Sequence, residues 1–174
     1  MAKQDRVLST ARLVLRAFLY VNIAAAVLFA FAIVISFPLN AALAARLTHK
    51  YGAAMDVDVV IWGMRLMLLA AIGAVIPLHR IFTALLAIVA TVRAGDPFTQ
   101  ANATRLQTIA WAMLVMQLLD LGFGAATGWA AAMRIDFLDW TPNFTGWIVV
   151  LMLFVLARVF QRGAEMRDDL AMTV

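Results

Sequence analysis

Four long apolar stretches constrain what this chain can fold into more than any other feature of its sequence. They occupy residues 17–37, 59–78, 109–130 and 145–160. A helix rises 1.5 Å per residue, so about 20 apolar residues are needed to cross the roughly 30 Å hydrocarbon core of a bilayer. The pattern therefore predicts an all-α integral membrane protein, a four-helix bundle that forms a single domain over residues 1–174.

The composition points to the same apolar surroundings. Hydrophobic residues make up 65% of the 174-residue chain and charged residues 14%, whereas soluble domains have roughly half and about a quarter. The first stretch follows basic residues, as in a signal peptide. It is longer than the roughly 7–15 apolar residues of a signal sequence, so we expect a retained helix.

The segment between the second and third stretches, residues 79–108, has two interpretations. Its apolar part, 81–92, has helical spacing but is too short to cross a bilayer. It either extends the second helix into the cytoplasm or forms a separate helix in the membrane interface. The extension is favoured because no turn residue follows His79 and Arg80. Gly95-Asp96-Pro97 then ends the helix, so the second and third helices both extend into the cytoplasm.

The distribution of basic residues predicts the orientation. If both termini are cytoplasmic, the inner side holds Lys3, Arg6, Arg12, Arg16, Arg80, Arg93, Arg105, Arg158, Arg162 and Arg167. The outer side then holds only Arg46, Lys50 and Arg134. For a bacterial inner-membrane protein, the positive-inside rule therefore favours cytoplasmic N- and C-termini. In the first outer loop, Ala41–Leu47 can form a short helix that ends near Gly52.

Charged and polar residues within the apolar stretches are expected to find partners. Arg65 and Asp120 both lie about 20 Å from the inner ends of their helices. Charges in a span usually pair or face a cavity, so we expect an ion pair that fixes helix register. The alternatives are a ligand or ion site, and two side chains that snorkel or face a cavity independently. Asn22 and Gln117 should form hydrogen bonds between helices. Small residues over 124–128 allow close approach of a helix, from this chain or a second copy.

Two segments carry motifs of a recognisable kind. The first runs from Arg93 through Gly95-Asp-Pro-Phe98, Asn102 and Arg105-Leu106 to Ile109-Ala-Trp111. The second is Leu156-Ala-Arg-Val-Phe-Gln-Arg-Gly163, followed by Met166-Arg-Asp-Asp-Leu170. Both resemble signatures of the bacterial membrane family called domain of unknown function 2975. The resemblance implies a regulatory pairing, because genes of that family often lie beside small Cro-type helix-turn-helix regulators.

The cytoplasmic segments predict an interaction surface. Its residues are Asp96, Pro97, Phe98, Asn102, Arg105, Arg158, Arg162, Arg167, Asp168 and Asp169. Acidic residues interleaved with basic ones suit a protein partner better than lipid alone, and Arg105 can pair with Asp168 or Asp169. Together with the resemblance, this surface predicts a regulatory protein that tethers or sequesters a small helix-turn-helix regulator without itself binding nucleic acid.

The alternative function is a membrane sensor or transporter for a small molecule or ion that uses Arg65 and Asp120. An enzyme is not expected. The chain has no cysteine, which excludes thiolate nucleophiles and cysteine metal sites. His49 and His79 fall on opposite sides of the membrane in the predicted topology. No metal or cofactor is therefore predicted.

Overall fold

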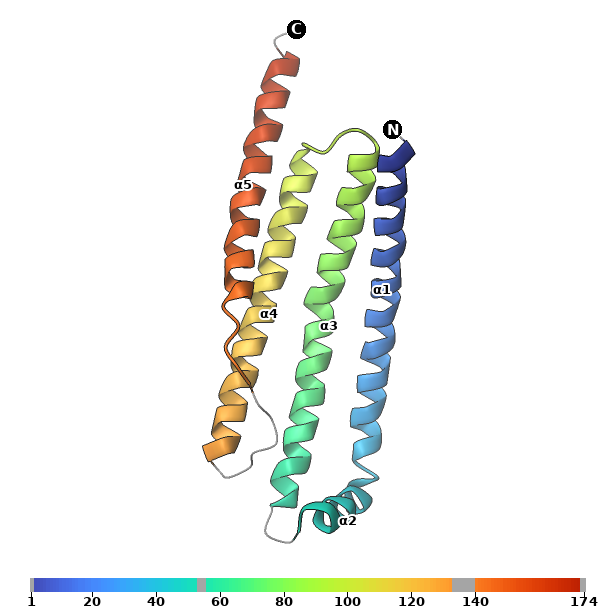
Figure 1. Ribbon diagram of the computed structural model, residues 1–174, viewed down its shortest axis with the longest axis vertical. Coiled ribbons are helices and arrows are strands. Elements are labelled where there is room, and N and C mark those ends of the chain that lie inside the picture. Colours follow the sequence, from blue (N-terminus) through green and yellow to red (C-terminus); the bar gives the residue numbers. More distant parts are fainter. Residues whose placement is uncertain (1, 53–55, 133–139, 173–174) are drawn as a thin grey trace. The chain divides into compact units, whose positions relative to one another are not determined.

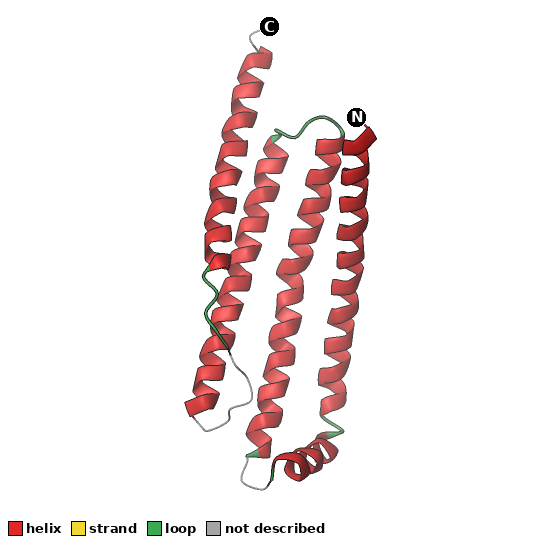
Figure 2. Cartoon of the chain, viewed as in Figure 1, coloured by secondary structure: helices red, strands yellow, loops and turns green. Residues whose placement is uncertain are grey.

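The computed structural model describes residues 2–52, 56–132 and 140–172, so Arg134 lies outside the described residues. This described part contains five helices and no strand (Figures 1 and 2). The helices are α1 (Ala2–Ser36), α2 (Asn40–Tyr51), α3 (Val57–Arg93), α4 (Gln100–Ala132) and α5 (Thr145–Met172). The predicted all-α class is confirmed.

Four of these helices are long and apolar enough to cross a membrane, and each overlaps one predicted stretch. The spans are Arg6–Ser36, Val57–Arg93, Gln100–Trp129 and Thr145–Arg167. Only 6% of the most apolar window of α1 is buried against the rest of the protein. An apolar helix surface of this kind matches contact with lipid, and the chain has the features of a membrane protein.

The fifth helix, α2, confirms the short helix predicted after the first apolar stretch. It ends at Gly52, whose N–H donates a hydrogen bond to the Thr48 carbonyl at 2.9 Å. Gly52 has a φ of +86°, in the left-handed region that glycine adopts without strain. Leu43 and Leu47 are half-buried, whereas Arg46 and His49 are exposed. The helix is therefore amphipathic and packs its apolar side inward.

Helix α3 runs without interruption through Pro77 to Arg93. The continuous helix excludes a turn after Arg80 and a separate interfacial helix over 81–92. The α3 end has the pattern of a Schellman motif. Gly95 has a φ of +84°, its N–H donates to the Val92 carbonyl, and the Asp96 N–H donates to the Thr91 carbonyl, both at 3.1 Å.

Contacts divide the described chain into two compact units. The first unit combines Met1–Asn22, Pro77–Leu118 and Asn143–Val174, and the second combines Ile23–Ile76 and Leu119–Pro142. The core of the first unit is formed by α3 and α4, where Ile81, Ala84, Ile109 and Ala112 are buried together. Contacts between aromatic rings join α1 to α3 and α4 to α5 in this unit. The Phe18 and Phe82 centroids lie 5.7 Å apart, and those of Trp111 and Phe154 lie 5.2 Å apart.

The second unit packs the end of α1 and all of α2 against the first turns of α3. Val60 and Ile61 are its most buried apolar side chains on α3. Phe37, just after α1, makes an edge contact with Trp62, with ring centroids 6.5 Å apart. Polar contacts where α1 ends and α2 begins hold Arg65.

Candidate functional site

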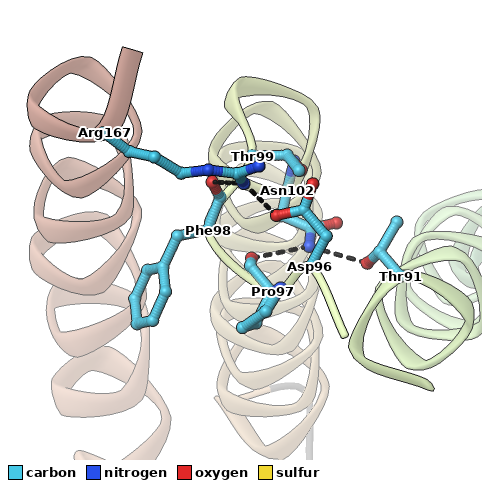
Figure 3. Close-up of polar contacts among 7 residues, drawn as sticks. All are labelled: Thr91, Asp96, Pro97, Phe98, Thr99, Asn102 and Arg167. Carbon is cyan, nitrogen blue, oxygen red and sulfur yellow. Dashed lines mark hydrogen bonds and ion pairs between the residues drawn. The ribbon is translucent and has the colours of Figure 1, made fainter. Parts of the chain in front are cut away.

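The turn between α3 and α4 is organised by Asn102, which is fully buried. Its side-chain amide donates to the Pro97 carbonyl at 2.8 Å and to the Thr91 hydroxyl at 2.7 Å (Figure 3). Its backbone N–H donates to the Thr99 hydroxyl at 3.2 Å, which caps the start of α4. We call these contacts, together with Arg105, the Asn102 network.

Arg105 belongs to this network and is half-buried. Its guanidinium donates to the Asn102 side-chain oxygen at 2.8 Å and to the Ala87 carbonyl at 3.4 Å. The Asn102 side chain is buried and so cannot itself contribute to the predicted interaction surface, whereas Arg105 is half-buried. The Asn102 amide satisfies the Pro97 carbonyl, which lies in the turn after α3 and has no helical partner. The Asp168 side chain, one predicted partner of Arg105, lies outside the described residues.

The first motif segment, in the turn after α3, contacts the second motif segment, which lies on α5. Arg167 forms an ion pair with Asp96 and donates to the Phe98 carbonyl at 3.3 Å (Figure 3). The Phe98 ring packs 5.0 Å from the Phe160 ring, centroid to centroid. A Cβ at Gly163 would lie 3.4 Å from the Phe98 ring, so the glycine leaves room for it. We call Asp96, Phe98, Phe160, Gly163 and Arg167 the cap.

The cap is accessible from outside the protein. The Arg167 side chain is 56% exposed and the Asp96 side chain 41% exposed. Of the predicted surface residues, Asp96, Phe98 and Arg167 therefore come together at the surface. Pro97 is half-buried and supplies an acceptor to the Asn102 network, whereas Arg162 and Asp169 are exposed elsewhere along α5.

Arg158 lies in a different place, on the wall of an open groove of about 290 Å³ between α4 and α5. The polar residues that line this groove are Gln100, Thr104, Gln107, Arg158 and Gln161. The Arg158 guanidinium donates to the Gln161 side-chain oxygen at 2.9 Å. The sequence pattern placed Arg158 on a helix face with Arg162, but it did not predict the groove.

Arg65, in the second unit, is buried and binds the corner between α1 and α2. Its guanidinium donates to the Ser36 hydroxyl at 3.1 Å, and to the Ser36 carbonyl and the Asn40 side chain at 2.9 Å each. Its Cζ atom lies 4.2 Å from the Phe37 ring centroid and 5.0 Å from that of Trp62. Hydrogen bonds and cation–π contacts thus surround the charge. We call these contacts the Arg65 network.

Asp120 has a different partner, so the predicted Arg65–Asp120 ion pair is not formed among the described residues. The Asp120 carboxylate accepts a hydrogen bond from the Trp140 indole at 3.3 Å. Arg65 is drawn instead to the end of α1, where the last carbonyls lack helical partners and the helix dipole favours a cation. Ser36 and Asn40, two polar residues at the end of an apolar stretch, were the signal for this partner.

The remaining polar predictions have mixed outcomes. Asn22 is buried. The Gln117 side chain donates to the Asn143 carbonyl at 3.5 Å, in the segment before α5 rather than on a helix. Gly124 leaves room for the Trp140 ring, whereas a Cβ at Gly128 would meet open space. Among the described residues, the small residue at 124 therefore accommodates an aromatic side chain of the same chain.

The comparisons with known proteins give a family and no activity. The model of the family described as protein of unknown function (DUF2975) matches residues 4–174, nearly the whole chain. No curated protein and no solved structure matches the sequence. The matched range includes both motif segments, which meet in the cap. This chain therefore belongs to the DUF2975 family of proteins of unknown function.

Proposed function

We propose that this chain is a bacterial inner-membrane protein that holds a small helix-turn-helix regulator at the membrane through its cap. The carrying observation is the contact between the two motif segments, through Asp96 and Arg167, which are 71 residues apart in the sequence. Asp96 and Phe98 come from the turn after α3, and Arg167 comes from α5. An exposed ion pair that joins a turn to a neighbouring helix suits recognition by a partner protein.

The proposed topology is a four-helix transmembrane bundle of α1, α3, α4 and α5 with both termini in the cytoplasm. The excess of basic residues in the segments that would then be cytoplasmic supports it. Continuation of α3 to Arg93 supports a cytoplasmic extension that carries the turn and the cap. A fluorescent protein that fluoresces only in the cytoplasm, fused to either terminus, tests this orientation. Both fusions should fluoresce.

The chemistry of the cap favours a protein partner. Phe98, whose carbonyl accepts from Arg167, is 47% exposed, and Met166, the residue before Arg167, is 62% exposed. Aromatic side chains, methionine and arginine are enriched in protein–protein interfaces. The buried Asn102 network holds the turn in place, which lowers the entropy that binding would cost.

The identity of the partner comes from the family resemblance. A regulator held at the membrane would have reduced access to DNA, so membrane binding would itself be the regulatory step. No nucleic acid contact by this chain is needed for that mechanism.

Binding of the full-length chain in detergent to a small helix-turn-helix regulator of the kind encoded beside genes of this family tests the proposal. We expect Asp96→Ala with Arg167→Ala to weaken the affinity at least about tenfold, as for central interface residues. The control is Arg46→Ala with Asp56→Ala, which also removes one charge of each sign but lies on the proposed outer side. Absence of binding by the wild type, or equal affinity of the cap variant and the control, would overturn it.

Sensing or transport through Arg65 and Asp120 is less well supported. That function requires the two residues to act together, and their hydrogen bonds hold them with separate partners.

A further inference from the structure

The groove between α4 and α5 has the chemistry of an anion site. Among the residues that line it, one is cationic, Arg158, and none is acidic. A guanidinium has five N–H donors, and the bond to Gln161 occupies one of them. Side-chain amides of Gln100 and Gln107 line the opposite wall. An anionic oxygen in the groove could therefore receive several hydrogen bonds.

The groove also lies where the apolar surface of these two helices gives way to a polar one. On α5, large exposed side chains run from Leu151 through Val155 to Val159, and the next exposed turn carries Arg162. On α4, the exposed Trp111 lies one turn beyond Gln107. In a membrane helix, this transition marks the level of the lipid headgroups.

We propose that this groove binds the headgroup of an anionic phospholipid. The phosphate would accept hydrogen bonds from Arg158, which suits a phosphate oxygen pair through its planar fork. Headgroup hydroxyls would meet the glutamine amides, and the acyl chains would lie along the exposed apolar side chains below. Basic pockets between membrane helices at headgroup level are known to hold such lipids.

The lining residues also discriminate between headgroups. A zwitterionic lipid presents a cationic amine beside its phosphate, and the groove lining offers no carboxylate to pair with that amine. Phosphatidylglycerol, with one net negative charge and two headgroup hydroxyls, matches the lining better. This inference is independent of the proposed regulator, because the groove residues take no part in the cap contacts.

Titration of phosphatidylglycerol into the detergent-purified full chain, followed by native mass spectrometry and by the unfolding midpoint, tests the site. Arg158→Ala should weaken binding about fivefold, as expected for one basic contact at a lipid surface. The matched control is Arg162→Ala, which removes the same charge one turn away and should bind like the wild type. Gln107→Leu keeps the charge and should weaken binding less, which provides a second variant if Arg158→Ala is poorly folded.

Three outcomes would overturn the proposal. Equal weakening by Arg158→Ala and Arg162→Ala would mean diffuse attraction to a basic surface. Equal affinity for phosphatidylcholine would mean that the headgroup charge is not recognised. Equal stabilisation by inorganic phosphate at the same concentration would mean that the ligand is a soluble anion rather than a lipid.

Discussion

Asn102 and Arg65 both bind backbone carbonyls where the chain leaves one helix and turns toward the next. Asn102 is a neutral amide whose partners lie within 11 residues along the chain. Arg65 is a cation whose partners lie 25 to 29 residues away. The Asn102 network is formed by a local sequence motif. The Arg65 network depends on α2, which returns the chain from the end of α1 to the start of α3.

The difference shows which buried polar contacts a motif can specify. Asn102 follows a glycine turn and a proline, so its reach to the Pro97 carbonyl is fixed by a few torsion angles. Arg65 has a long flexible side chain, and its position along α3 says nothing about which neighbouring element it meets. A buried charge thus needs no opposite charge when a helix end supplies oriented carbonyls.

Replacement of Arg65 should have the largest effect. Arg65→Met removes three hydrogen bonds from a charged donor and leaves the Ser36 carbonyl unpaired, so we expect about 3 kcal/mol less free energy of unfolding. Unfolding in mixed micelles with increasing SDS measures it. The comparison variant is Asp120→Asn, which keeps an oxygen acceptor for Trp140 and should cost less than about 1 kcal/mol. Losses of unfolding free energy of similar size for the two variants would instead support the Arg65–Asp120 ion pair.

Replacement of Asn102 should have the next largest effect. Asn102→Ala leaves the Pro97 carbonyl without its side-chain donor and Arg105 without the closer of its two acceptors, at a cost of about 2 kcal/mol in the same assay. Thr104→Ala, at an exposed position on the same helix, is the control and should change the free energy by less than about 0.5 kcal/mol. Unchanged stability of Asn102→Ala would show that the Asn102 side chain does not hold the turn.

Gly124 tests the partner assigned to Asp120. Alanine at 124 would overlap the Trp140 ring and displace its indole from Asp120, whereas alanine at Gly128 meets open space and favours the helix. We expect Gly124→Ala to be less stable than Gly128→Ala by about 2 kcal/mol, from overpacking at one site and helix propensity at both. Matching midpoints in thermal unfolding would place Trp140 elsewhere.

Replacement of Arg167 should have the smallest effect on stability. The Asp96–Arg167 pair is exposed, and such pairs contribute less than about 1 kcal/mol. Arg167→Ala should therefore lower the unfolding midpoint slightly in low salt, and the difference should vanish near 1 M salt, where charges are screened. A loss that persists in high salt would show that the Phe98 contacts, rather than the charges, depend on Arg167.

The helices were predictable because apolar length alone specifies them. Each of the four long helices overlaps its predicted stretch, and the glycines at 52 and 95 end α2 and α3 as expected. These features depend on local composition and on one backbone conformation, both of which are present in the sequence.

Side-chain partners were less predictable, for a geometric reason. Counting residues gives the depth of Arg65 and Asp120 along their helices, but each residue also turns the helix by about 100°. Equal depth therefore does not put two side chains on facing sides. The cap and the groove depend on how α5 lies beside the α3–α4 turn and α4, and the pattern within one helix cannot specify that.

The sparse packing of α1 has a consequence for how its sequence can vary. Side chains such as Val27, Phe31 and Val34 are exposed, and one of its few buried residues is Asn22. Exchange among leucine, isoleucine, valine and phenylalanine at these exposed sites preserves the apolar surface that contacts lipid. We therefore expect α1 to drift freely in residue identity among relatives while its length and polarity profile persist. Residue identity should be retained mainly at its contact points, Phe18, Asn22 and Ser36.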